Sequence, residues 1–260
     1  MSDYSYGISL SGGGARAIVQ LGILQRLYEH NIKPSVIAGT SMGAVIAAFI
    51  AAGFEPKAIR NIFKKHIETL SFSWLSLVYA RHRSMVELMN VLNENLASND
   101  FESLQIPLYV SITNLNTGKN EIISSGKLFE YIIASATIPV LFKPKIINNQ
   151  YYVDGGVTNN FPARVLQGKA DKIIGIHVNY IEPVDSFSSI IDIADRIYQV
   201  SIYNTVHHKI HLCDYFIDPP ESRKYLTFDF NKIDEIYTVG YELGEEFAQK
   251  IIHTSSSVDI

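Results

Sequence analysis

The sequence contains one cysteine, Cys213, among its 260 residues. A single cysteine excludes an internal disulfide framework and a metal site built from several thiolates, and it is typical of a reducing compartment. Long apolar runs are also missing, since the longest, residues 44–54, is far below the roughly 18 residues that a membrane-spanning helix requires. The first ten residues, MSDYSYGISL, contain neither a basic region nor an apolar signal core. We therefore expect a soluble, cytoplasmic protein whose membrane contact is at most peripheral.

The chain has no excess of positive charge. Its 22 lysines and arginines are outnumbered by 26 acidic residues, and the formal net charge is −4. This balance does not favour nucleic acid as a partner. Hydrophobic residues make up 47% of the chain, enough for one sizeable core. We expect a single domain over residues 1–260, with a frayed tail at 252–260.

Short apolar segments alternate with segments of helical periodicity. The first strand is expected at residues 6–11 and the second at 35–38, with a helix over 15–30 between them. Further strands are expected at 108–115, 151–153, 172–178 and 215–217, and residues 120–125 can pair with 108–115 through the turn at Thr117–Gly118. Further helices are expected at 41–52, 56–67, 84–96, 128–136, 186–212 and 232–252. Strands separated by helices of this length predict an α/β layer fold with a mostly parallel sheet.

Ser41 lies in the pentapeptide Gly39-Thr40-Ser41-Met42-Gly43, which fits the nucleophile-elbow pattern G-x-S-x-G. The elbow needs a strand before the serine and a helix after it, and both are expected here. Gly39 and Gly43 leave room where a side chain would collide with the neighbouring strand or the start of the helix. The alternative interpretation is that Ser41 only caps the helix and the glycines permit tight packing.

Three consecutive glycines, Gly12, Gly13 and Gly14, lie between the first strand and the first helix. Their bare amides are the donors that an oxyanion hole requires, and Arg16 would add positive charge or anchor the loop. The same segment formally fits the dinucleotide fingerprint G-x-G-x-x-G/A. That fingerprint needs an acidic residue near the end of the second strand, and residues 34–38 contain none.

Asp154 follows the apolar segment Tyr-Tyr-Val and precedes Gly155 and Gly156. An aspartate at a strand end, followed by two glycines, can lie against another backbone and offer its carboxylate to a hydroxyl group. Taken alone, Asp-Gly-Gly is a weak pattern, because Asp-Gly is a common turn signal. Together with the two other motifs it indicates a site.

Histidines offer an alternative catalytic base, in the order serine, acid, histidine of α/β-hydrolases. His177 ends an apolar strand, but the serine follows only the second strand, whereas an α/β-hydrolase needs more sheet before its nucleophile. We therefore expect His177 to be structural. The histidines at 207, 208 and 211 are interpreted as a solvated helix face rather than a metal site.

Four motifs in order, GGGAR, GTSMG, ASATIPVLFKP (Ala134 to Pro144) and DGG, resemble the patatin-like phospholipase family of the compact bacterial type. The resemblance implies a three-layer α/β/α sandwich and hydrolysis of lipid acyl esters without a metal or other cofactor. It also implies that Ser41 is the nucleophile, that Asp154 is its base, and that the amides of Gly12 to Gly14 form the oxyanion hole. The domain would then be a patatin-like acyl hydrolase.

The resemblance leaves the chemistry and the substrate open. A phospholipase A, a lysophospholipase, an acyltransferase and a non-catalytic lipid-sensing protein on the same fold are the alternatives. Because an ordinary aspartate is a weak base, we expect burial beside Tyr151, Tyr152 and Val153 to raise the pKa of Asp154. Residues 70–83, aromatic with a basic end, suit either a peripheral lipid contact or a core helix.

Overall fold

The computed structural model describes residues 4–70, 77–188 and 190–256. Its centre is an eight-stranded sheet in the order β5-β6-β3-β2-β1-β7-β8, with β4 paired to β3. The strands are β1 Tyr6–Leu10, β2 Pro34–Thr40, β3 Leu108–Asn114, β4 Lys119–Ile123, β5 Lys145–Ile147, β6 Gln150–Asp154, β7 Lys172–Ile176 and β8 Tyr215–Ile217. The five strands from β3 to β8 in this order are parallel, whereas β4, β5 and β6 pair antiparallel. The expected α/β fold with a mostly parallel sheet is confirmed.

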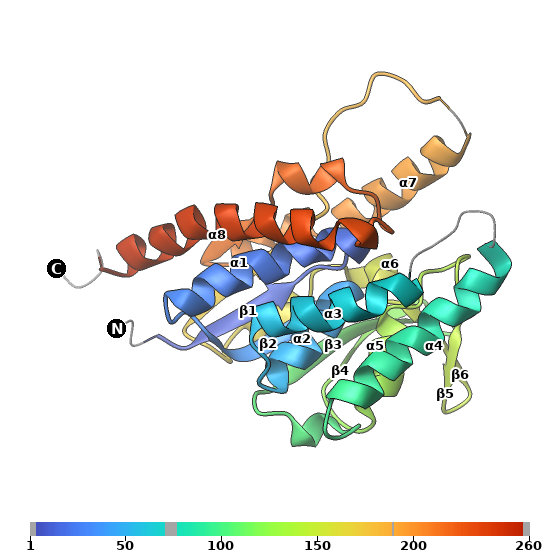
Figure 1. Ribbon diagram of the computed structural model, residues 1–260, viewed down its shortest axis with the longest axis horizontal. Helices are drawn as coiled ribbons and strands as arrows, with labels where there is room; N and C mark the ends of the chain where they lie inside the picture. Colours follow the sequence, from blue (N-terminus) through green and yellow to red (C-terminus); the bar gives the residue numbers. More distant parts are fainter. Residues whose placement is uncertain (1–3, 71–76, 189, 257–260) are drawn as a thin grey trace.

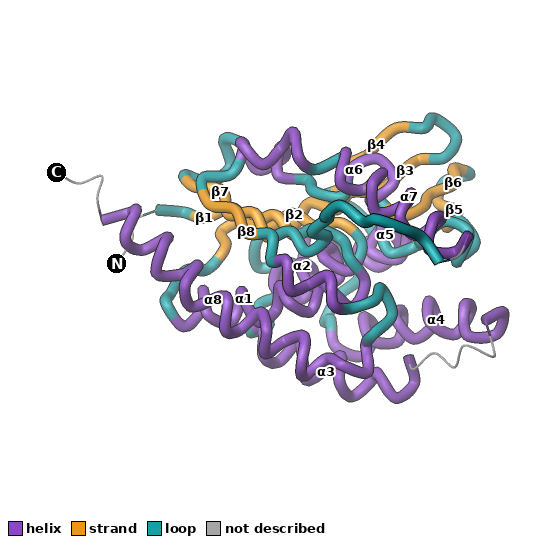
Figure 2. The backbone as a smooth tube through the Cα atoms, turned by 90° about the horizontal axis from the view of Figure 1, so that it is seen from above, coloured by secondary structure: helices purple, strands orange, loops and turns teal. Residues whose placement is uncertain are grey.

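Helices cover both faces of the sheet. Figures 1 and 2 show α1, α2, α3, α4 and α8 on one face and α6 on the other, so the molecule has the three layers that the resemblance implied. The α-helices are α1 Ile18–Glu29, α2 Met42–Ala51, α3 Pro56–Leu70, α4 Leu77–Asn95, α5 Leu128–Ser135, α6 Gly156–Asn159, α7 Ile190–Asn204 and α8 Ile233–Ser256. Short 3-10 helices are η1 Gly14–Ala17, η3 Phe101–Ser103, η4 Ala163–Leu166, η5 His207–Leu212, η6 Pro220–Lys224 and η7 Phe230–Lys232.

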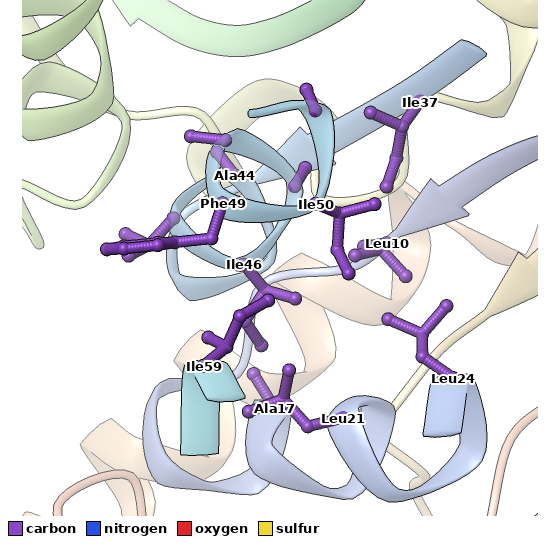
Figure 3. Close-up of a cluster of buried hydrophobic side chains, with 14 of the residues drawn as sticks. Leu10, Ala17, Leu21, Leu24, Ile37, Ala44, Ile46, Phe49, Ile50 and Ile59 are labelled. Carbon is purple, nitrogen blue, oxygen red and sulfur yellow. The ribbon is translucent and has the colours of Figure 1, made fainter. Parts of the chain in front are cut away.

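The side chains of strand β2 are buried on both faces of the sheet. Ile37 points into the main core, whereas Val36 and Ala38 pack with Leu166 of η4 on the opposite face. Because side chains alternate along a strand, a strand that is apolar at successive positions must be buried on both sides. Figure 3 shows the main core cluster, which joins Leu10 and Ile37 of the sheet to Leu21, Leu24, Ile46, Phe49 and Ile59 of the helices.

Helix α2 is buried almost all round, as its apolar sequence predicts, because it lies between the sheet and the neighbouring helices. This position matters for the site, since α2 begins directly after Ser41. No helix within the described ranges is both long enough and apolar enough to cross a membrane.

The structure differs from the sequence-based expectations in the ends of two helices, α7 and α8, and in one additional strand, β5. The helix expected over 186–212 ends at Asn204, because Val206 turns inward to pack with Phe161 and Ala163, and a separate 3-10 helix, η5, follows. Strand β5 was not expected, since three residues are too few to show a period. The final helix runs to Ser256, beyond the expected end at 252, and residues 257–260 lie outside the described part of the chain.

Candidate active site

Strands β2 and β6 meet end to end along one edge of β3. Thr40, the last residue of β2, pairs with Ser111, and Asp154, the last residue of β6, pairs with the next residue, Ile112. Since β4 occupies the other edge of β3 at these positions, β2 and β6 must share one edge. The carboxyl ends of two strands that run in opposite directions therefore face each other, and Ser41 follows directly.

Ser41 occupies the sharp turn between β2 and α2. Its backbone has φ 55° and ψ −130°, a sparsely populated region for a residue with a side chain. A Cβ atom on Gly43 would lie 2.4 Å from the carbonyl oxygen of Ser11, and one on Gly39 would lie 2.6 Å from that of Gly43. Both contacts are with backbone atoms, so only glycine fits, as the elbow pattern predicts.

The Ser41 hydroxyl group donates a 2.6 Å hydrogen bond from Oγ to Oδ2 of Asp154. The other carboxylate oxygen, Oδ1, accepts a 2.7 Å bond from the amide of Gly156. Ser41 is 7% exposed and Asp154 only 1%. A buried carboxylate bonded to a single hydroxyl group can accept its proton, which is the arrangement that nucleophilic catalysis by serine requires.

Burial raises the pKa of Asp154 from 3.8 to about 6, and the hydrogen bonds from Ser41 and Gly156 oppose the rise. Removing the carboxylate from water penalises its charged form more than these two donors stabilise it. The direction agrees with the expectation from the sequence. A base of this strength is largely ionised at neutral pH and still holds a proton better than a free aspartate does.

Ser135 is a site residue that the sequence analysis missed. Its hydroxyl group accepts a 2.8 Å bond from the amide of Ser41 and donates a 2.7 Å bond to the carbonyl oxygen of Ser111. This serine, the last residue of α5, therefore ties the turn at Ser41 to strand β3. It lies within the segment that carried the family resemblance, but no local pattern distinguishes it from an ordinary helical serine.

The glycine-rich loop lies directly against Ser41, because a Cβ atom on Gly12 would come within 2.8 Å of the Ser41 Cβ. The amide of Gly12 donates a long, 3.4 Å bond to the carbonyl oxygen of Asn160. Among the described residues, the amides of Gly13 and Gly14 have no protein acceptor. Gly14 lines the same pocket as Ser41. Two of the three expected amides therefore have no competing protein acceptor among the described residues, and the third is partly engaged.

Arg16 anchors the loop, one of its two expected roles. The side chain is 7% exposed, its Nε lies 3.5 Å from the Gly13 carbonyl oxygen, and a terminal nitrogen lies 3.4 Å from Thr227 Oγ1. The backbone of Thr227 also accepts a 2.8 Å bond from the amide of Ala15. The loop that precedes α8 therefore holds the glycine-rich loop in place through Thr227.

Gly155 and Gly156 have distinct structural roles. A Cβ atom on Gly155 would lie 2.2 Å from the carbonyl oxygen of Ser111, so the chain after Asp154 passes directly over β3. Gly156 supplies the amide that bonds the Asp154 carboxylate. Together they hold the carboxylate in place.

An apolar pocket opens beside Ser41 and encloses about 610 Å³ of empty space, including its open mouth. Its walls come from the start of α2, from α4, from the segment after α5 and from the loop before α8. The lining residues are Gly14, Ser41, Met42, Met85, Leu88, Ala136, Ile138, Phe142, Thr227, Phe228 and Phe230. The segment after α5 belongs to one of the four sequence motifs, whereas no motif covers α4 or residues 227–230.

None of the four histidines considered in the sequence analysis lines this pocket. His177 is fully buried, and its Nδ1 lies 2.9 Å from Oδ2 of Asp218. Histidines 207, 208 and 211 are exposed on η5, and the described residues include no cluster of three or more potential metal ligands. The side chains of residues 70–83, for which a lipid contact or a core position was expected, lie outside the described part of the structure.

Two solved structures are similar to this chain at low sequence identity. VipD from Legionella pneumophila matches with a TM-score of 0.46 and 15% identity, over 92% of this chain and 67% of that chain. The type III effector protein ExoU matches with a TM-score of 0.41 and 14% identity, over 95% of this chain and 53% of that chain.

Similar sequences occur in much longer proteins. Lysophospholipase nte1 of Aspergillus terreus is 27% identical over 95% of this chain, which spans 18% of that protein. Lysophospholipase NTE1 of Saccharomyces cerevisiae is 26% identical over 97% of this chain, which spans 17% of it. The sequence model of the patatin-like phospholipase family matches residues 8–166. This range is more than half of the chain and contains all four motifs. The chain therefore belongs to the patatin-like phospholipase family.

Proposed function

We propose that this chain hydrolyses acyl esters of lipids, with Ser41 as nucleophile and Asp154 as general base. The observation that carries the proposal is the 2.6 Å hydrogen bond between these two side chains, because Ser41 also lines an apolar pocket. Serine is a weak nucleophile unless a neighbouring base takes its proton. Among the described residues, the pocket lining itself contains no charged side chain, so Asp154 is the base that reaches Ser41.

In the first half of the proposed reaction, Ser41 Oγ attacks the ester carbonyl carbon while its proton passes to Asp154. The carbonyl oxygen becomes an alkoxide, and the free amides of Gly13 and Gly14 donate hydrogen bonds to it. The tetrahedral intermediate then collapses. The bond to the alcohol breaks, the alcohol takes the proton from Asp154, and the acyl group remains on Ser41.

In the second half, a water molecule replaces the alcohol. Asp154 takes a proton from this water, whose oxygen attacks the acyl-serine carbonyl carbon, and the same two amides stabilise the second alkoxide. When this intermediate collapses, the fatty acid leaves and Ser41 regains its proton from Asp154. The carboxylate thus alternates between base and acid, for which a pKa of about 6 is suitable.

The pocket indicates the class of substrate. Its lining is mostly aliphatic, aromatic and thioether side chains, which suit an acyl chain. Each CH₂ group of the chain that leaves water contributes about 0.8 kcal/mol to binding. The names of the relatives, lysophospholipases, agree with a lipid that carries one acyl chain.

The proposal is tested by incubating the purified chain with lysophosphatidylcholine, phosphatidylcholine and p-nitrophenyl esters and measuring released fatty acid. Ser41→Ala should lower the rate at least about a thousandfold, because the nucleophile is lost. Ser124→Ala, at an exposed serine, is the matched control and should leave the rate unchanged. Equal rates for Ser41→Ala and the unaltered chain would refute the assignment.

The same incubation separates the alternatives. With glycerol added as a second acceptor, a hydrolase releases free fatty acid, whereas an acyltransferase forms a new ester. A lipid-sensing protein without catalytic activity would leave every substrate intact.

A further inference from the structure

Val140 is the most exposed large apolar side chain among the described residues, at 89%. Its backbone is in the left-handed region, with φ 68°, which is unusual and strained for a β-branched residue. Ile138 and Phe142, on either side of it in sequence, line the pocket beside Ser41. The segment after α5 therefore carries a solvent-exposed valine between two residues that line the pocket.

Leu226 repeats this arrangement on another segment. It is 71% exposed, while Thr227 and Phe228, the next two residues, line the same pocket. Two segments far apart in the sequence thus each carry one exposed aliphatic side chain within two positions of residues that line the same pocket. Single exposed apolar residues are common on protein surfaces. Two of them beside the lining of one apolar pocket favour a surface that contacts an apolar partner.

Lysines accompany both apolar side chains. Lys143 and Lys224 are exposed, and each lies within three positions of Val140 or Leu226. The adjacent Arg223 is paired with Glu182. Among the described residues, neither Lys143 nor Lys224 forms an ion pair. The exposed side chains of Val140 and Leu226 are therefore accompanied by two lysines without an ion-pair partner. These positive charges occur on a chain whose net charge is negative.

We propose that the pocket rim, defined as Val140, Lys143, Lys224 and Leu226, docks on the surface of a membrane that contains anionic lipids. The inference rests on the proposed function, because a lipid ester must reach the pocket through this mouth. A protein that covered the rim would block the mouth, whereas a lipid surface delivers the acyl chain into it. Aliphatic side chains enter the headgroup region, and lysines remain beside anionic headgroups.

Binding is measured in the Ser41→Ala background, so that the vesicles stay intact. The full chain is sedimented with vesicles of equal parts phosphatidylcholine and phosphatidylglycerol, and with vesicles of phosphatidylcholine alone. Combining Val140→Asp with Leu226→Asp should weaken binding to the anionic vesicles at least about tenfold. Combining Lys143→Gln with Lys224→Gln should weaken it roughly fivefold per lysine and remove the preference for anionic vesicles.

Ile197→Asp is the matched control, because Ile197 is 65% exposed on α7 and lies outside the rim. It should bind vesicles like the parent chain. The proposal is overturned if the parent binds no vesicles or if the control loses binding equally. It is also overturned if the rim variants bind normally, or if the parent is a dimer in solution that the rim variants dissociate.

A second measurement keeps this inference separate from the proposed function. In the chain with Ser41 intact, the rim variants should hydrolyse a soluble short-chain p-nitrophenyl ester at the parent rate and lose activity only on vesicles. Equal loss on both substrates would contradict a docking role. A parent that binds vesicles but hydrolyses neither substrate would refute the proposed function and leave the docking surface standing.

Discussion

Ser41 and Asp154 are 113 positions apart in the chain, yet their side chains are joined by a hydrogen bond of 2.6 Å. The contact follows from the sheet, because β2 and β6 end against each other along one edge of β3. Ser135 and Gly156 then fix the Ser41 backbone and the Asp154 carboxylate by one hydrogen bond each. The geometry of the pair is thus set by strand register and not by loop conformation alone.

Ester hydrolysis should depend on pH through Asp154. Its pKa is about 6 in the folded chain, and only the ionised carboxylate can take the proton of Ser41. The value of kcat/KM for a soluble ester should therefore rise about tenfold per pH unit below about pH 6 and level off above about pH 7. A rate profile that is flat across this range, or that rises with a midpoint near the ordinary aspartate value, would contradict the role of Asp154.

Asp154→Asn should stabilise the fold while it removes activity. Between about pH 4 and pH 6 the folded chain retains a proton that the unfolded chain releases, so the free energy of unfolding falls as pH rises through this window. At pH 7 the neutral variant should be more stable than the parent by up to about 3 kcal/mol. The difference should vanish below about pH 4.

Urea denaturation at pH 7 and below about pH 4 measures this difference in the free energy of unfolding. Asp185→Asn, on an exposed loop, is the control and should change the stability little at either pH. A variant that is less stable than the parent at neutral pH would show that the carboxylate charge is stabilised by its surroundings and not penalised by them.

Ser135→Ala tests whether the backbone of the turn must be held. The substitution leaves the amide of Ser41 and the carbonyl oxygen of Ser111 without their shared partner, which should cost about 1–3 kcal/mol of stability. We expect kcat to fall while KM changes little, because the nucleophile is misplaced and the pocket is intact. Steady-state kinetics with Ser124→Ala as control measure the effect, and an unchanged kcat would refute the positioning role.

Leu88→Phe tests whether the pocket holds the acyl chain. Leu88 lines the pocket, whereas Val86, on the same helix α4, is 45% exposed and does not. A larger side chain at position 88 should shorten the pocket, so kcat/KM for long-chain esters should fall about fourfold per excluded CH₂ group. Short-chain esters should be little affected, and Val86→Phe should leave the whole series unchanged. Equal effects of the two substitutions would place the acyl chain elsewhere.

The sequence pointed to Ser41 through Gly39 and Gly43 and to Asp154 through Gly155, three positions at which a Cβ atom would collide with backbone atoms. Gly43 is an example, since a side chain there would meet the Ser11 carbonyl oxygen. The clashing atom belongs to another segment, but the glycine that it requires lies close to the site residue in the sequence and leaves a readable local pattern. The same reasoning could not show that the amide of Gly12 is partly engaged by Asn160, because that contact depends on the packing of a distant segment.

The residues that line the pocket form no comparable pattern in the sequence. Met85, Leu88 and Phe228 resemble ordinary core residues in the sequence, and only the packing of α4 and the loop before α8 brings them beside Ser41. The end of α7 was missed for a related reason. Val206 continues the helical pattern of apolar residues, but it is buried against Phe161 on another segment, and that contact ends the helix.

The most direct test of the proposed mechanism is covalent labelling with a fluorophosphonate, which reacts with activated serines. The account predicts one label per chain, located on Ser41 by peptide mass spectrometry, and labelling that is at least about a hundredfold slower in Asp154→Asn. A label on another residue, no label at all, or equal rates in the parent and Asp154→Asn would contradict it.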